Sequence, residues 1–153
     1  PEELASPVLT LEGQQFPITG GVQGADGPGN SFVYIPSLKA VVTGDIVFDH
    51  AYFGVPREMA RENWRKTIDQ LAALKPDVVI PGHEGPGATH DWKAIEWMNK
   101  YIADWDANVA RSKNAAEMRA NVLRQYPNLG MAFTLNDRVA TYFPAQPAAG
   151  GSR

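Results

Sequence analysis

Residues 31–48 have the sequence SFVYIPSLKAVVTGDIVF, and residues 77–83 have the sequence DVVIPGH. In both segments an apolar, β-rich run ends at a glycine, which Asp45 follows in the first and His83 in the second. The apolar residues of these runs do not alternate with polar ones, which favours central strands buried on both faces. Because loops at the carboxyl ends of strands converge in layered α/β proteins, we expect Asp45 and His83 to lie together at one sheet edge.

A carboxylate and an imidazole in this arrangement suit a borderline metal such as zinc. The glycine before each residue lets the backbone turn sharply enough to aim the side chain into a shared site. Gly-Asp and Gly-His dipeptides are common, so without further context the pair only suggests a metal site.

The residues between the two segments predict a helix. Between residues 58 and 74, the apolar side chains of Trp64, Ile68 and Leu71 recur at the spacing of one helix face, and charged residues lie opposite. Pro56 precedes this helix without interrupting it. The order strand, helix, strand therefore predicts a helix packed on a sheet.

The start of the chain predicts β-structure. Residues 8–11 and 15–18 are extended candidates on either side of a Glu-Gly turn, which indicates a hairpin. Residues 20–29 contain five glycines and one proline, a composition that predicts a loop without regular structure.

Beyond Gly87 the pattern is mainly helical. Thr89 is predicted as an N-cap, with Asp91 in the first turn, and an apolar stripe follows it. Further helices are predicted at about residues 115–125, ending before Pro127, and near residues 133–142. The stripe consists of Trp92, Ile95, Met98, Ile102 and Trp105.

Composition narrows the class of protein. The 153 residues are 44% hydrophobic and 20% charged, which is enough apolar material for one domain with a core. The net charge of −3 is spread along the chain with basic and acidic residues interleaved, so we expect no nucleic-acid partner. No segment is apolar for long enough to span a membrane, and a soluble protein is expected. The absence of cysteine excludes disulfides and thiol nucleophiles but leaves cytoplasm and periplasm equally open.

We expect a single domain over residues 1–147 and a flexible tail over residues 148–153, which are small and linker-like. The chain begins at Pro1 without methionine, and a fragment or a processed form is expected.

Residues 8–106 resemble the second half of metallo-β-lactamase superfamily enzymes, through the Gly-Asp strand end, the intervening helix and the Gly-His strand end. The resemblance implies an α/β fold, half of a four-layer αββα sandwich with a mixed β-sheet covered by helices. It also implies that Asp45 bridges or ligates metal and is part of the catalytic centre, and that His83 is a terminal ligand. Zinc is the implied metal, with two ions in the complete protein and iron or manganese as other options.

Two departures from the family pattern stand out. The family usually carries a histidine just before the turn into the strand at residues 31–35, where this chain has Asp26. Asp26 is either a replacement metal ligand or a turn former beside glycine. The family's His-x-His-x-Asp-His motif is also missing, since the only histidines are His50, His83 and His90. The chain alone is therefore expected to hold metal weakly, if at all, and to be inactive.

His50 and Glu84 are candidate substrate-binding residues. His50 follows the Gly-Asp strand closely, and Glu84 adjoins His83, where it is also suited to orient a ligand. The alternatives are a solvated histidine and a surface or capping glutamate.

Two functions follow from these observations. The first is the carboxy-terminal part of a zinc-dependent hydrolase that uses metal-activated water on an ester, thioester, lactone, amide or phosphoester of a small-molecule substrate. The alternative is a non-catalytic binding or assembly module derived from the same fold. Half a sandwich leaves one apolar sheet face bare, so we expect either a missing amino-terminal half or a homodimer to cover it.

Overall fold

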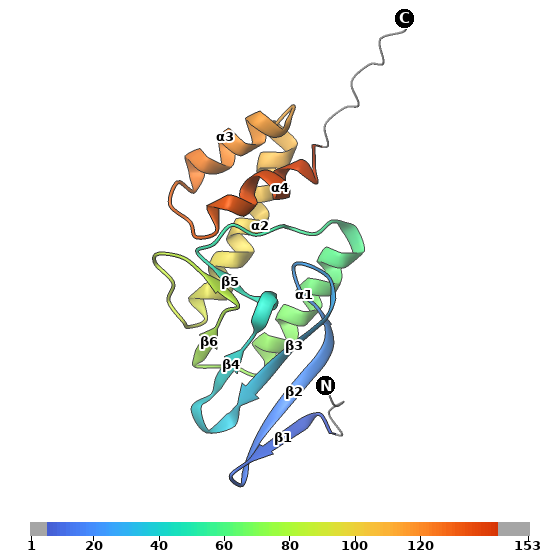
Figure 1. Cartoon of the computed structure of the whole chain (residues 1–153), viewed down its shortest axis with the longest axis vertical. Coiled ribbons are helices and arrows are strands. Elements are labelled where there is room, and N and C mark those ends of the chain that lie inside the picture. Colours follow the sequence, from blue (N-terminus) through green and yellow to red (C-terminus); the bar gives the residue numbers. More distant parts are fainter. Residues whose placement is uncertain (1–5, 144–153) are drawn as a thin grey trace, which may run out of the picture.

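The computed structural model describes residues 6–143, apart from the side chain of Glu58. Five strands form one sheet, in the order β1-β2-β3-β4-β6 (Figure 1). Neighbouring strands are antiparallel except β4 and β6, which run parallel. The sheet is therefore mixed, as predicted. Its strands are β1 (Val8–Leu11), β2 (Gln14–Gln23), β3 (Pro28–Ile35), β4 (Ala40–Val42) and β6 (Val78–Ile80).

Two very short strands continue this architecture. β5 (Phe48–Asp49) pairs in parallel with β7 (His83–Glu84) just beyond the ends of β4 and β6. The segments after β4 and after β6 thus run side by side twice, which positions residues 43–50 next to residues 81–84. Short 3₁₀ turns follow β3 and β4 and precede α4; they are η1 (Pro36–Leu38), η2 (Gly44–Ile46) and η3 (Ala132–Thr134).

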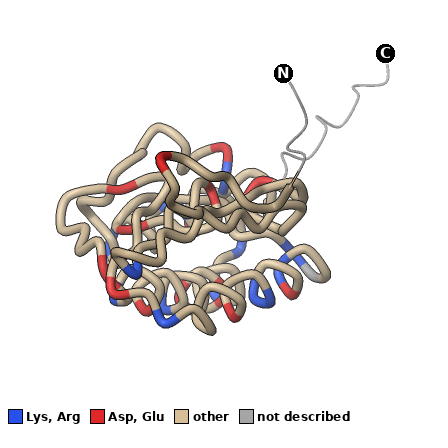
Figure 2. Tube along the Cα trace, turned by 90° about the horizontal axis from the view of Figure 1, so that it is seen from below, with Lys and Arg blue, Asp and Glu red and all other residues tan. Residues whose placement is uncertain are grey.

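Four α-helices complete the described part of the chain. They are α1 (Glu58–Ala73), α2 (Lys93–Arg111), α3 (Ala115–Gln125) and α4 (Leu135–Ala140). α2, α3 and α4 gather at the end away from the β1–β2 hairpin (Figure 1). The helices lie along one side of the strands, and basic and acidic residues alternate on them (Figure 2). Within residues 6–143, no helix has the length and apolarity needed to cross a membrane.

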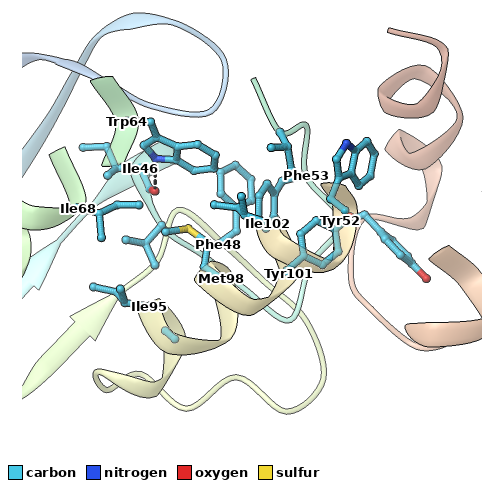
Figure 3. Packing of buried hydrophobic residues seen from close by; sticks show 14 of the residues in the cluster. Ile46, Phe48, Tyr52, Phe53, Trp64, Ile68, Ile95, Met98, Tyr101 and Ile102 are labelled. Atoms are coloured by element: carbon cyan, nitrogen blue, oxygen red, sulfur yellow. Dashed lines mark hydrogen bonds between the residues drawn. The ribbon is translucent and has the colours of Figure 1, made fainter. Parts of the chain in front are cut away.

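One apolar core joins sheet and helices. The predicted face of α1 is buried, with Trp64 and Leu71 fully inaccessible and Ile68 nearly so. Trp64 also donates a hydrogen bond from Nε1 to the backbone oxygen of Ile46, at 2.9 Å (Figure 3). This bond ties α1 to η2, the turn that carries Asp45. Four residues of the predicted α2 stripe, Ile95, Met98, Ile102 and Trp105, are buried in the same core.

The prediction of a structureless glycine segment at residues 20–29 was wrong. β2 extends to Gln23 and β3 begins at Pro28, so only residues 24–27 form a turn. The pairing register shifts between Gly20 and Gln23, and Gly21 has φ = +68°. Glycine thus permits a strand irregularity here instead of ending the strand.

Two further predictions need correction. Thr89 is not the N-cap of α2, which begins at Lys93; Asp91 accepts a 2.8 Å hydrogen bond from the Lys93 N–H, and this bond lowers the pKa of the Asp91 carboxyl. The central strands are not buried on both faces either. Val42 of β4 and Ile80 of β6 are 40% and 39% exposed, because the helices cover only the opposite face.

Replacing Trp64 with phenylalanine tests the bond between α1 and η2. Trp64→Phe leaves the Ile46 carbonyl without its buried donor, whereas Trp105→Phe is the matched control, because Trp105 is equally buried and its Nε1 has no hydrogen-bond partner among the described residues. We expect Trp64→Phe to lower the free energy of unfolding by about 1–3 kcal/mol more than Trp105→Phe does. Urea denaturation measures both; equal losses would contradict a stabilising role for the bond.

Candidate metal and substrate site

Asp45 and His83 lie side by side at the carboxyl ends of β4 and β6. Asp45 Oδ1 is 3.2 Å from His83 Nε2, and the two side chains are 41% and 40% exposed. The structure thus brings the two predicted strand-end residues together in an open position that a small ligand can reach. The imidazole ring also stacks on Phe48, with 5.3 Å between ring centroids, so its other surface rests on the core.

Backbone hydrogen bonds hold the two strand ends in this position. The Thr43 N–H and hydroxyl both donate to the Ile80 oxygen at 3.0 Å, and the Gly82 N–H donates to the Val47 oxygen at 3.0 Å. On one segment the bonded residues, Thr43 and Val47, lie on either side of Asp45. On the other segment, Ile80 and Gly82 come just before His83. The separation of the pair is therefore set by backbone pairing.

Gly82 permits the closest approach between the two segments. A Cβ at this position would lie 2.4 Å from the Gly44 backbone carbon and oxygen and 2.8 Å from Asp45 Oδ1. Gly44 itself has φ = +49°, a left-handed conformation that suits glycine. Both glycines singled out in the sequence are thus needed for a steric reason.

The turn that carries Asp26 also reaches Asp45, but through the backbone. The Ala25 N–H donates to the Asp45 backbone oxygen at 3.0 Å, whereas the exposed Asp26 side chain accepts a 3.1 Å hydrogen bond from Asn30 Nδ2. Within residues 6–143 no three His, Asp or Glu side chains form a group that could hold a metal ion. Asp26 therefore does not join Asp45 and His83 in this structure, and its proposed role as a ligand stays a prediction.

His50 is held by a buried carboxylate that the sequence analysis overlooked. His50 Nδ1 lies 2.5 Å from Asp49 Oδ1, and the Asp49 side chain is completely buried. The backbone N–H of Thr89 donates to the other oxygen of Asp49 at 2.7 Å, and the imidazole stacks on Trp97. His50 is thus a positioned, partly exposed imidazole. The adjacent Asp-His dipeptide was the available signal, but only the fold reveals that Asp49 is buried.

The Glu84 side chain pairs with a histidine other than its neighbour His83. Its carboxylate pairs with Nε2 of His90, and both side chains are about half exposed. The roles of His50 and Glu84 in substrate binding remain predictions. Tyr52 and Phe53, which follow the site along the chain, are core residues with about 1% exposure each.

The fold and the paired strand-end residues define a layered α/β protein with an open carboxylate–imidazole pair at the edge of its sheet. The family model described as the metallo-beta-lactamase superfamily matches residues 12–83, which include both Asp45 and His83. This match over residues 12–83 confirms the resemblance to the metallo-beta-lactamase superfamily that was inferred from the sequence.

Solved structures with this fold are similar to the chain. A metallo-beta-lactamase family protein from Thermus thermophilus matches 93% of this chain and 47% of its own, with TM-score 0.58 and 21% identity. A metallo-beta-lactamase from Pontibacter korlensis matches 66% and 47%, with TM-score 0.51 and 21% identity. A double mutant of the sec-alkyl sulfatase PisA1 matches 90% and 26%, with TM-score 0.50 and 16% identity. At these identities the likeness shows a shared fold, and the chain spans less than half of each structure. No curated protein matches the chain.

Gly82→Ala tests whether the close approach of the strand ends sets the site. We expect a loss of about 1–3 kcal/mol in the free energy of unfolding, because the added methyl group overlaps the backbone at Gly44. The His83 imidazole resonances should shift as well, since Asp45 has to move. Gly27→Ala is the control, because a Cβ there meets nothing within 4 Å. Matching stability and imidazole spectra in the two variants would rule out the steric argument.

Proposed function

We propose that this chain supplies Asp45 and His83 as ligands to the metal centre of a metal-dependent hydrolase. The observation that carries the proposal is the 3.2 Å approach of Asp45 Oδ1 to His83 Nε2 at the open end of the sheet. The match to the superfamily model supports it, since the paired residues lie within the matched segment.

The two side chains have the donor atoms that zinc accepts. Zinc–oxygen and zinc–nitrogen bonds of about 2.0–2.2 Å in tetrahedral geometry separate two donors by roughly 3.3–3.6 Å, close to the observed distance. The same distance also suits a hydrogen bond between the pair. A structural or catalytic zinc needs at least three protein ligands, so the described residues provide part of a site. We propose that the remaining ligands come from a further segment of a longer protein or from a partner chain.

Each residue has a defined task in this proposal. Zinc, or iron or manganese in its place, would supply a Lewis acid there, and zinc lowers the pKa of bound water to near neutrality. Asp45 and His83 would hold the ion, and Phe48 stacks on the His83 ring and limits its orientation. His50, oriented by the buried Asp49, is placed to accept or donate a proton at Nε2 to a small-molecule substrate. The substrate bond is an ester, thioester, lactone, amide or phosphoester.

The uncovered face of the sheet is an argument for a partner that packs on it. Strand register aligns Ile18, Val33, Val42 and Ile80 in one row across β2, β3, β4 and β6. This row lies on the face opposite buried Val41 and Val79, and its last two members are exposed. We propose that a second sheet covers it, either from the other half of the sandwich or from a second copy of this chain.

A non-catalytic binding or assembly module of the same fold is the second candidate. It is favoured by the absence of a three-ligand group from the described residues. Metal analysis of the longest natural form of the protein separates the two functions, because a hydrolase retains a stoichiometric divalent ion and a module does not.

Cobalt titration of the chain tests the half-site. We expect weak binding that falls at least about tenfold in His83→Gln and in Asp45→Asn, because even the loss of an outer-shell partner typically costs roughly 10–100-fold in affinity. The visible absorption of bound cobalt reports occupancy.

The matched control is His90→Gln, which removes a histidine of similar exposure, 48% against 40% for His83, that pairs with Glu84. Equal losses in His90→Gln and His83→Gln would indicate adventitious binding. Unchanged affinity in His83→Gln and Asp45→Asn would exclude the proposed ligands.

A further inference from the structure

A cavity with two arginines is bordered by the turn that contacts Asp45. Its volume is about 210 Å³, and it is lined by the β2–β3 turn, the segment before α1 and the end of α4. Ala25 belongs to both places, because it lines the cavity and its N–H donates to the Asp45 backbone oxygen. The cavity and the candidate metal site therefore share one turn of the chain.

Arg138 enters this cavity with an unsatisfied donor. Its Nε is buried and has no hydrogen-bond partner among the described residues. The guanidinium lies against Gly54, where a Cβ would come within 2.8 Å of Arg138 Cδ and within 3.3 Å of Nε and Nη1. Buried polar groups normally have partners, so an unsatisfied Nε beside a cavity indicates a missing acceptor.

Arg57 faces the same cavity from the start of α1. Its guanidinium lies over the ring of Tyr142, 4.1 Å from the centroid. The Tyr142 hydroxyl is held in turn, donating to the Val55 oxygen at 2.8 Å and accepting from Arg61 at 2.9 Å. The ring under Arg57 is therefore held in place by two hydrogen bonds of its own hydroxyl.

Among the side chains that the structure describes, which do not include that of Glu58, no carboxylate pairs with the two arginines of this cavity. The nearby carboxylate of Asp106 is already paired, at 2.6 Å, with Arg61, which also donates to the Tyr142 hydroxyl. The cavity also adjoins the amino-terminal end of the 16-residue helix α1, which adds positive potential.

We propose that this cavity binds an oxyanion, of the carboxylate or phosphoryl type, through Arg57 and Arg138. Guanidinium groups match the planar fork of such anions and bind them through charge-assisted hydrogen bonds. The cavity is smaller than the pockets of about 300–1,000 Å³ that hold drug-sized ligands, so it suits a small anion or the charged end of a larger molecule. The site does not depend on a metal at Asp45 and His83.

Titration of the metal-free chain with inorganic phosphate, and separately with acetate, tests this site by amide and arginine Nε chemical shifts. We expect saturable shifts at Gly54, Arg138 and Tyr142, with a Kd on the order of 1 mM for the preferred anion. Preference for phosphate identifies a phosphoryl ligand, and preference for acetate a carboxylate. Arg138→Gln and Arg57→Gln should each weaken binding about tenfold or more.

Two variants distinguish anion binding in this cavity from nonspecific attraction to positive charge on the protein surface. Gly54→Ala keeps the net charge but displaces Arg138, and it should weaken binding severalfold. Arg65→Gln removes an exposed arginine of α1 outside the cavity and should leave binding unchanged. Circular dichroism verifies folding, and Arg57→Gln tests the site even if Arg138→Gln does not fold. Equal weakening by Arg65→Gln, or no saturable shift with either anion up to about 50 mM, would overturn the proposal.

Discussion

The close parallel approach of the backbones at Gly44 and Gly82 is the constraint on which the rest of the site depends. Glycine at position 82 has no side chain to keep the two backbones apart, so the segments after β4 and β6 stay close beyond the ends of the strands. They pair again as β5 and β7. This pairing places Asp45 beside His83 and sets the start of the segment that carries Asp49. A bulkier residue at either glycine acts on the site through backbone geometry, before any effect on ligand chemistry.

The site rests directly on the aromatic core. His83 stacks on Phe48, Phe48 contacts Phe53, and Phe53 packs against Trp97, which stacks on His50. The imidazoles of His83 and His50 are thus both supported by one continuous set of rings. Side chains in a close-packed core have little free space in which to change rotamer. The rings therefore limit the orientations that the two histidines adopt. Stability and site geometry are therefore coupled in this protein.

Sequence patterns predicted the elements whose signals are local. The spacing of Trp64, Ile68 and Leu71 identified α1, and Pro127 marked the end of the helix predicted at residues 115–125. Prediction failed where local signals are ambiguous. Glycines at residues 20–29 are compatible with a loop and with an irregular strand, and only pairing with β3 selects the strand. An apolar run likewise does not reveal whether one face of a strand or both faces are covered.

By itself, the sequence determined the class of fold, the order of its elements and the two strand ends that carry a carboxylate and an imidazole, because hydrophobic periodicity and strand-terminal glycines act over a few residues. Tertiary structure alone decided that Asp45 and His83 are 3.2 Å apart, that buried Asp49 orients His50, and that Arg57 and Arg138 share a cavity. The last two cases depend on burial and on packing between distant segments. Such features arise from the sum of many contacts, and no local pattern of residues encodes them.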